Sequence, residues 1–256
     1  MRIANYIPNT ITSLNLLSGC VAVILSFNGD FKPALLFIIA AACFDFCDGF
    51  AARLLKAYSP LGKELDSLAD MISFGLAPAC IMFNKILELY GVSADNIISM
   101  ELHDSIKYLL PLLCALLIAV FSALRLAKFN IDTRQTENFI GLATPSCALI
   151  TGSLIYAAET YPAIDSFLAA HMYILPVIAV VLSLLLVCEI PMFSFKFKTF
   201  CWANNRLKYI FLLCAAALAI TETILLGHFP LSIWIFTTFV FYILLNVALY
   251  LYTKGR

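Results

Sequence analysis

Long apolar stretches follow one another along almost the whole chain, and this pattern constrains the fold more than any other feature. About 20 consecutive, mainly apolar residues cross the hydrocarbon core of a bilayer as a helix. Eight segments fit this rule, at roughly residues 10–28, 33–53, 67–90, 107–128, 141–159, 171–190, 207–226 and 230–252. The runs are continuous rather than alternating, so they predict helices and not the strands of a membrane barrel. We expect an all-α polytopic membrane protein, a bundle of about eight transmembrane helices that forms one domain over residues 1–256.

The charge content of the chain agrees with this environment. Only 12% of the residues are charged and 62% are hydrophobic, whereas soluble domains carry about 25% charged residues. This composition excludes an ordinary soluble enzyme and a disordered protein. The formal net charge is zero, which excludes binding to nucleic acid through bulk positive charge. The expected surroundings are the lipid bilayer, with no nucleic-acid partner.

The basic residues lie mostly on one side of an eight-helix arrangement. Cytoplasmic loops of membrane proteins carry an excess of Lys and Arg. Thirteen of the 16 basic residues share one side: Arg2, Arg53, Lys56, Lys63, Arg125, Lys128, Arg134, Lys196, Lys198, Arg206, Lys208, Lys254 and Arg256. We therefore expect both termini to be cytoplasmic, in a protein of the bacterial inner (cytoplasmic) membrane.

Four aspartates stand near the predicted cytoplasmic ends of the second and third segments. An ionisable residue close to hydrocarbon is costly and is a functional candidate by default. Helical spacing places the two aspartates of each segment on one face of the helix, in a stripe that also holds small or basic residues. The first stripe holds Asp45, Asp48, Gly49, Ala52 and Arg53, and the second holds Gly62, Asp66 and Asp70. Two antiparallel helices joined by a short loop can turn both stripes toward each other.

Four converging carboxylates cannot all remain ionised unless cations lie among them. Oxygen ligands favour hard divalent metals, and two such metals can clamp a phosphoryl group between attacking and leaving oxygens. The alternative is a solvated cluster at the helix ends, in which the acids pair with Arg53, Lys56 and Lys63. Four acids accompanied by small residues favour a binding site.

The two stripes together form a spaced motif. It reads Asp45-x2-Asp48-Gly49-x2-Ala52-Arg53-x8-Gly62-x3-Asp66-x3-Asp70. This motif resembles the signature of the CDP-alcohol phosphatidyltransferase family. The resemblance implies two divalent cations, Mg²⁺ or Mn²⁺ with Ca²⁺ as a third candidate, held by the four aspartates. It also implies that Asp70 is the general base, that CDP-diacylglycerol is the donor, that CMP leaves, and that the protein is a homodimer.

The resemblance also implies contacts to the CDP-linked lipid. The positions concerned are Asn9, Thr12, Gly49, Ala52, Arg53, Ser59 and Gly62. The first two belong to a Pro-Asn-x-x-Thr element at residues 8–12. Taken alone, that element is also typical of an Asn helix cap followed by a Thr that bonds to the helix backbone.

A second region, residues 125–146, is the predicted acceptor site. Residues 65–79, 125–130 and 138–146 are similar to the branch of the family that uses serine as acceptor, although Ala143 stands where that branch carries proline. A serine carboxylate needs a cation, for which Arg125 is our candidate. Further polar contacts are expected from Lys128, Asn130, Asn138, Thr144 and Ser146. Alternatively, the basic residues here serve topology and anionic lipid headgroups.

The sequence thus predicts transfer of a phosphatidyl group from CDP-diacylglycerol to L-serine, giving phosphatidylserine and CMP. One alternative keeps this chemistry with glycerol 3-phosphate or an inositol phosphate as acceptor. Another is a cation-coupled secondary transporter, although such proteins place their charges near the bilayer midplane on broken helices. Glu189 and Glu222 receive no role from the sequence.

Overall fold

The structure is a computed structural model, and it describes residues 6–92, 102–132, 139–194 and 202–254. These residues are almost entirely helical. The helices are α1 (Tyr6–Phe27), α2 (Phe31–Leu54), α3 (Pro60–Asp70), the π-helix η2 (Met71–Leu76), α4 (Ala77–Tyr90), α6 (Leu102–Ile131), α7 (Thr144–Thr160), α8 (Pro162–Ala170), α9 (Ile174–Val187), α10 (Trp202–Leu226) and α11 (Leu231–Lys254). The predicted all-α membrane architecture is confirmed.

The described helices give fewer membrane-spanning stretches than the eight predicted from the sequence. Six helical stretches in the described chain are long and apolar enough to cross a membrane, and the bent pair α8–α9 makes up to seven. That pair bends by 91°, as in a broken span or a re-entrant loop, and is not one straight helix. Helix α7 has 17 residues, or about 26 Å at 1.5 Å per residue, which is slightly less than the hydrocarbon thickness of about 30 Å.

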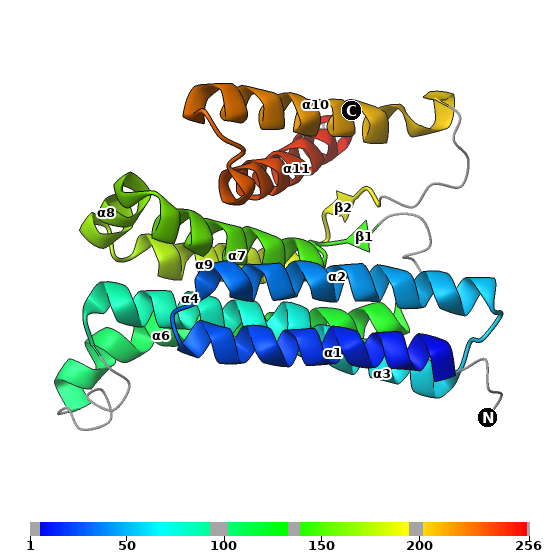
Figure 1. The fold of residues 1–256 in the computed structure, drawn as a ribbon, viewed down its shortest axis with the longest axis horizontal. Helices are drawn as coiled ribbons and strands as arrows, with labels where there is room; N and C mark the ends of the chain where they lie inside the picture. Colours follow the sequence, from blue (N-terminus) through cyan, green and yellow to red (C-terminus); the bar gives the residue numbers. More distant parts are fainter. Residues whose placement is uncertain (1–5, 93–101, 133–138, 195–201, 255–256) are drawn as a thin grey trace.

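Helices α1, α2 and the continuous stretch α3–η2–α4 pack together, and α6, α7 and α9 complete the bundle. The N-terminal end of α1 and the α2–α3 connection lie at one end, on the right in Figure 1. The α1–α2 connection and α8 lie at the other end. Helix α11 joins the bundle through α7, and α10 packs on α11.

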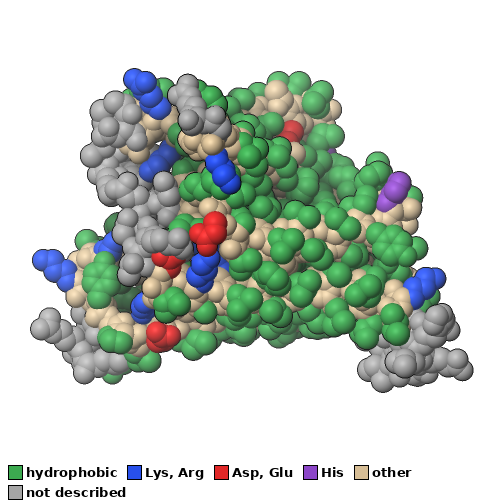
Figure 2. All heavy atoms as spheres, turned by 180° about the vertical axis from the view of Figure 1, so that it is seen from behind, with side chains coloured by type: hydrophobic (Ala, Val, Ile, Leu, Met, Phe, Trp, Pro, Cys, Tyr) green, Lys and Arg blue, Asp and Glu red, His purple; other side chains and the backbone are tan. Residues whose placement is uncertain are grey.

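The surface of the molecule is suited to lipid. Figure 2 shows apolar side chains over most of one face, while Lys and Arg side chains gather mainly toward one end of it. Exposed residues on α10 include Leu213, Ile220 and Leu225. A lipid-exposed helix has no need of a polar outer face, so this distribution fits an integral membrane protein.

A short antiparallel pair of strands interrupts the helices, and the sequence did not predict it. Strands β1 (Phe139–Ile140) and β2 (Pro191–Met192) pair with Phe139 opposite Met192. Gly141 follows with a φ of 77° and packs against the last carbonyls of α9, where a Cβ would lie 2.7 Å from the Leu186 oxygen. Helix α7 therefore begins at Thr144, three residues later than predicted, because the intervening backbone is bonded to α9.

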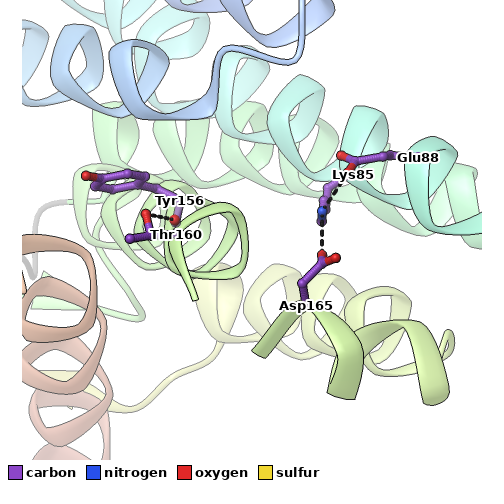
Figure 3. A network of polar contacts seen from close by, with 5 residues as sticks. All are labelled: Lys85, Glu88, Tyr156, Thr160 and Asp165. Atoms are coloured by element: carbon purple, nitrogen blue, oxygen red, sulfur yellow. Dashed lines mark hydrogen bonds and ion pairs between the residues drawn. The ribbon is translucent and has the colours of Figure 1, made fainter. Parts of the chain in front are cut away.

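A buried lysine links the helices at the end of the bundle that holds the α1–α2 connection. The Lys85 ammonium on α4 lies 3.0 Å from Oε1 of Glu88 and 2.7 Å from Oδ1 of Asp165 on α8 (Figure 3). A cavity of about 570 Å³ lies beside this network, with Asn84 and Glu159 also in its wall. It is separate from the aspartates of the sequence motif.

Candidate functional site

Three of the four motif aspartates converge where α2 meets α3. Asp45, Asp48 and Asp66, called here the aspartate triad, each offer a carboxylate oxygen, and these oxygens lie within 4.8 Å of one another. The spacing within α2 puts Asp45 and Asp48 on one face, and α3 returns antiparallel to bring Asp66 opposite. The predicted convergence of these three carboxylates is confirmed.

The turn between α2 and α3 makes this convergence possible. Lys56 adopts a left-handed conformation with a φ of 49°, while the amides of Lys56 and Ala57 bond to the carbonyls of Arg53 and Ala52. This is the hydrogen-bond pattern of a Schellman motif, which ends a helix and reverses the chain. Ser59 then caps α3 by accepting a bond from the Gly62 amide at 3.0 Å.

Asp70 does not belong to the triad, although it ends the same helix. Its Oδ1 accepts a hydrogen bond from Nδ2 of Asn15 on α1, at 3.1 Å. Asp70 is close enough to Asp45 and Asp66 to interact with them electrostatically. The π-helix η2 begins at the next residue, and π-turns are frequent at functional sites.

The triad is chemically suited to divalent cations. All its ligands are oxygens, which hard cations such as Mg²⁺ and Mn²⁺ prefer. Oδ1 of Asp66 is buried, and no residue that the structure describes donates a hydrogen bond to it. A buried polar atom normally has a partner, so a cation beside Asp66 would supply the missing interaction.

A pocket of about 260 Å³ opens next to the triad, between α1, α2 and α3. It is called here the α1–α3 pocket. All seven residues predicted to contact the CDP-linked lipid line it: Asn9, Thr12, Gly49, Ala52, Arg53, Ser59 and Gly62. Asp48 and Asp66 lie in the same wall. One face of the pocket is therefore carboxylate, and the rest is built from small and polar side chains.

Two glycines shape this pocket. A Cβ at Gly62 would lie 3.0 Å from Oδ1 of Asn9 and 3.0 Å from Oγ of Ser59, so a larger residue would crowd both. A Cβ at Gly49 would meet nothing within 4 Å and would project into open space. Arg53 lies over this stripe with Nε bonded to the Gly49 carbonyl at 3.0 Å, and its side chain is exposed.

The Pro-Asn-x-x-Thr element lies inside α1 rather than at its start. Asn9 is within the helix, and its carbonyl accepts a bond from Ser13, so the interpretation of Asn9 as a helix cap is wrong. The Thr12 hydroxyl does reach the Pro8 carbonyl at 3.0 Å, as the alternative interpretation proposed. It also donates a hydrogen bond to Oδ2 of Asp48.

Arg125 on α6 is buried at 7% exposure and faces the aspartates. Its electrostatic neighbours include Asp70 and Asp45, and its Nη1 donates to Thr144 Oγ1 at 3.3 Å. The rings of Phe129 and Phe139 lie 5.5 Å and 5.7 Å from the guanidinium carbon. Nε is buried without a hydrogen-bond partner among the described residues, which is unusual for a buried donor.

The other predicted acceptor residues do not all gather around Arg125. Lys128 pairs with Glu189 at the end of α9, so it is engaged in an ion pair between α6 and the segment after α9. Asn130 donates to Ser67 Oγ at 2.9 Å. Ser146 is half-buried in the first turn of α7. Asn138 lies outside the described residues.

The substitution of Ala143 for proline leaves the backbone in a shape that proline itself adopts. Ala143 has a φ of −69° and a ψ of 140°, and proline fixes φ near −65°. The segment before it is held by the amide of Leu142, which bonds to the Leu185 carbonyl at 2.8 Å. The position of Thr144 next to Arg125 therefore does not depend on a proline.

Sequence reasoning missed two side chains near the site. Asn15 was not singled out, although it stands one helical turn after Thr12 and is fully buried in a predicted lipid-crossing helix. Lys63 was considered as one of the basic residues of the predicted cytoplasmic side and as a partner of the acids, but it also lines the α1–α3 pocket and donates to the Asn130 carbonyl at 3.2 Å. The signal for Asn15 was an amide among apolar residues, which in a membrane helix indicates a partner on a neighbouring helix.

Comparisons with known proteins agree with this geometry. A CDP-diacylglycerol–serine O-phosphatidyltransferase of Bacillus subtilis is 35% identical over 160 residues, which are 61% of this chain and 77% of that protein. An archaetidylserine synthase of Methanothermobacter thermautotrophicus is 31% identical over 157 residues, 60% of this chain and 59% of its own length. A CDP-diacylglycerol–serine O-phosphatidyltransferase of Methanocaldococcus jannaschii is 33% identical over 163 residues, 64% of this chain and 66% of its own length.

The match to a family model is broader than the catalytic motif. The model of the CDP-alcohol phosphatidyltransferases matches residues 5–185, which include α1, both aspartate-bearing helices, and Arg125 and Thr144 of the predicted acceptor region. The chain thus belongs to the CDP-alcohol phosphatidyltransferase family.

Proposed function

We propose that this protein transfers the phosphatidyl group of CDP-diacylglycerol to the hydroxyl of L-serine, giving phosphatidylserine and CMP. The observation that carries the proposal is the aspartate triad beside the α1–α3 pocket, in a chain whose family transfers such groups. The names of the three relatives all include serine, which supports serine as the acceptor.

The CDP-linked lipid would occupy the α1–α3 pocket. Gly49, Ala52 and Gly62 leave room for a headgroup against the backbone, and Arg53 can bond to a phosphate oxygen. The aspartates would hold two divalent cations, which would stabilise the negative charge that develops on the transferring phosphate. Asp45, Asp48, Asp66 and Asp70 are the proposed ligands, with Mg²⁺, Mn²⁺ and Ca²⁺ as the candidate ions.

Asp70 is the proposed general base. The serine hydroxyl oxygen would attack the phosphorus on the diacylglycerol side of the pyrophosphate, while its proton passes to the Asp70 carboxylate. The bond between that phosphorus and the bridging oxygen would break, and CMP would leave. Arg125 would hold the serine carboxylate, because its buried guanidinium lies near Asp70 and retains an unpaired Nε. The other proposed polar contacts of the acceptor are Thr144, Asn130, Asn138, Ser146 and Lys128.

The proposed orientation in the membrane follows from the distribution of charged residues. The basic residues favour a cytoplasmic location for the triad and for both termini. The chain would cross the inner membrane eight times if α7 and the α8–α9 pair each form one span. Residues 1–256 would form one domain, and we propose that the protein is a homodimer. Serine from the cytoplasm and a lipid from the bilayer could then reach the same site.

The test is an assay of the purified protein in detergent micelles that contain CDP-diacylglycerol. We expect CMP release that requires both serine and a divalent cation, together with phosphatidylserine as the lipid product. Parallel reactions replace serine with glycerol 3-phosphate or inositol 1-phosphate. Turnover with a phosphorylated acceptor but not with serine would overturn the acceptor assignment, and an absence of CMP with every acceptor would overturn the proposed chemistry.

A further inference from the structure

Asn15 is the side chain of α1 that touches the proposed base directly. It is fully buried, and its Nδ2 donates to Oδ1 of Asp70 at 3.1 Å. The two residues are 55 positions apart in sequence, so the bond joins α1 to the end of α3. One carboxylate oxygen of Asp70 is thereby occupied by a neutral donor.

The backbone around Asn15 is held against η2 at two further points. The Ser73 hydroxyl donates to the Asn15 carbonyl at 2.9 Å. One turn later, a Cβ at Gly19 would lie 2.4 Å from Ser73 Oγ and 2.7 Å from Ser73 Cα, so only glycine allows the two helices to approach this closely. The position of the Asn15 amide relative to Asp70 is therefore fixed by packing and not by its own hydrogen bond alone.

The amide oxygen of Asn15 makes no hydrogen bond within the described chain. This atom, Oδ1, is buried. Leaving a buried acceptor unpaired lowers stability, so an amide here is not what stability alone would favour. Asn246 on α11 is a useful contrast, because its amide accepts from the Phe193 amide and donates to the Tyr242 carbonyl.

We propose that Asn15 is a positioning residue for the transfer reaction: it holds Oδ1 of Asp70 and so orients the other oxygen, Oδ2, toward the acceptor hydroxyl. This inference rests on the proposed function, in which Asp70 takes the proton. A carboxylate without this bond would rotate about its Cβ–Cγ axis and would present either oxygen. Loss of orientation at a reacting group lowers the rate of the chemical step more than it weakens substrate binding.

The experiment compares Asn15→Leu with the wild type in the serine-dependent CMP assay. Leu has a similar size but no donor. We expect kcat to fall roughly 10- to 100-fold, with KM for serine and for CDP-diacylglycerol changed less than about threefold. Ser73→Ala removes only the backbone anchor of Asn15 and is expected to give a smaller fall in kcat. It also provides a test if Asn15→Leu does not fold.

The matched control is Asn84→Leu, which removes a half-buried asparagine that bonds to the Cys80 carbonyl in the wall of the separate cavity beside Lys85. Its thermal unfolding midpoint should fall, but kcat per folded molecule should remain at the wild-type value. The inference is overturned if Asn15→Leu and Ser73→Ala keep the wild-type kcat, or if they raise KM while kcat is unchanged. Both results presuppose that the wild type turns over serine, so a failure of the proposed function would be seen first and separately.

Discussion

The hydroxyl of Thr12 on α1 donates a hydrogen bond to Oδ2 of Asp48 on α2. The same hydroxyl lies 3.0 Å from the Pro8 carbonyl one turn earlier in α1. Both side chains are buried, and both line the α1–α3 pocket. The first helix of the chain is thus bonded to the aspartate triad and forms part of the site wall.

This bond predicts different behaviour for two substitutions of Thr12. Thr12→Val keeps the shape but loses the donor to Asp48, so we expect kcat/KM for CDP-diacylglycerol to fall about 10-fold or more. Thr12→Ser keeps the hydroxyl and should stay within about threefold of the wild type. Steady-state kinetics of the two variants check this, and equal activities would show that the bond to Asp48 has no part in catalysis.

Substitution of Arg125 is expected to weaken binding of the acceptor and not of the donor. Arg125→Lys keeps the charge but loses the planar guanidinium that bonds to Thr144 and lies over Phe129 and Phe139, and the two cations are not interchangeable at such a site. We expect KM for serine to rise at least 10-fold, with KM for CDP-diacylglycerol nearly unchanged. An equal rise in both constants would argue against a role in holding the serine carboxylate.

Removal of divalent cations should abolish turnover. With excess EDTA we expect CMP release at background level, and addition of Mg²⁺ or Mn²⁺ should restore it. Asp66→Asn should raise the cation concentration needed for half-maximal activity, because it removes a charged ligand from the triad. The same variant should weaken the cation-dependent rise of the unfolding temperature.

The matched control for this measurement is Asp165→Asn. This aspartate pairs with Lys85 near the α1–α2 connection and should leave the cation requirement as it is in the wild type. Full activity in EDTA, or an equal shift for both variants, would contradict a metal site at the triad.

The left-handed backbone of Lys56 predicts that glycine at this position makes the protein more stable. Its φ of 49° lies in the left-handed region, which is unfavourable for a residue with a Cβ by about 1–2 kcal/mol. Lys56→Gly should therefore raise the free energy of unfolding, by up to about 1 kcal/mol after the greater flexibility of glycine in the unfolded chain is included. Thermal unfolding in detergent measures this.

A lysine inside α3 provides the comparison for that substitution. Lys63→Gly introduces glycine into a helix, where it should lower stability by about 1 kcal/mol. If both glycine variants are destabilised equally, the left-handed turn at Lys56 is not the reason for its effect.

Much of the fold and the site could be predicted because the signals are local. Each of the eight apolar segments overlaps a helix or a bent helix pair, and the i, i+3 and i, i+4 spacings correctly brought Asp45 and Asp48 to one face of α2. Five of the seven residues predicted to contact the CDP-linked lipid line one pocket because they flank the α2–α3 turn, and Asn9 and Thr12 complete its wall from α1. Their roles in binding remain predictions.

The rest depends on contacts between distant segments. The bond from Asn15 to Asp70 and the ion pair of Lys128 with Glu189 join residues that are 55 and 61 positions apart, and no local pattern specifies either partner. Glu222 on α10 likewise accepts a bond from Thr237 on α11. The bend between α8 and α9 and the β1–β2 pair were also not predicted, because hydropathy reports how apolar a segment is and not its backbone path.

The π-helix η2 has a consequence for how the stretch from Pro60 to Tyr90 tolerates change. Each residue of an α-helix turns the chain by about 100°, and a π-turn contains one residue more than an α-turn. Deleting one residue between Met71 and Leu76 would convert the wide turn into an α-turn and would leave Asp66 and Asp70 in the same rotational phase relative to α4. A regular α-helix built from all the residues present would instead rotate the two carboxylates by about 100° relative to α4. The wide turn thus absorbs one residue of chain length, so that the carboxylates of α3 and the packing face of α4 keep a fixed angular relation.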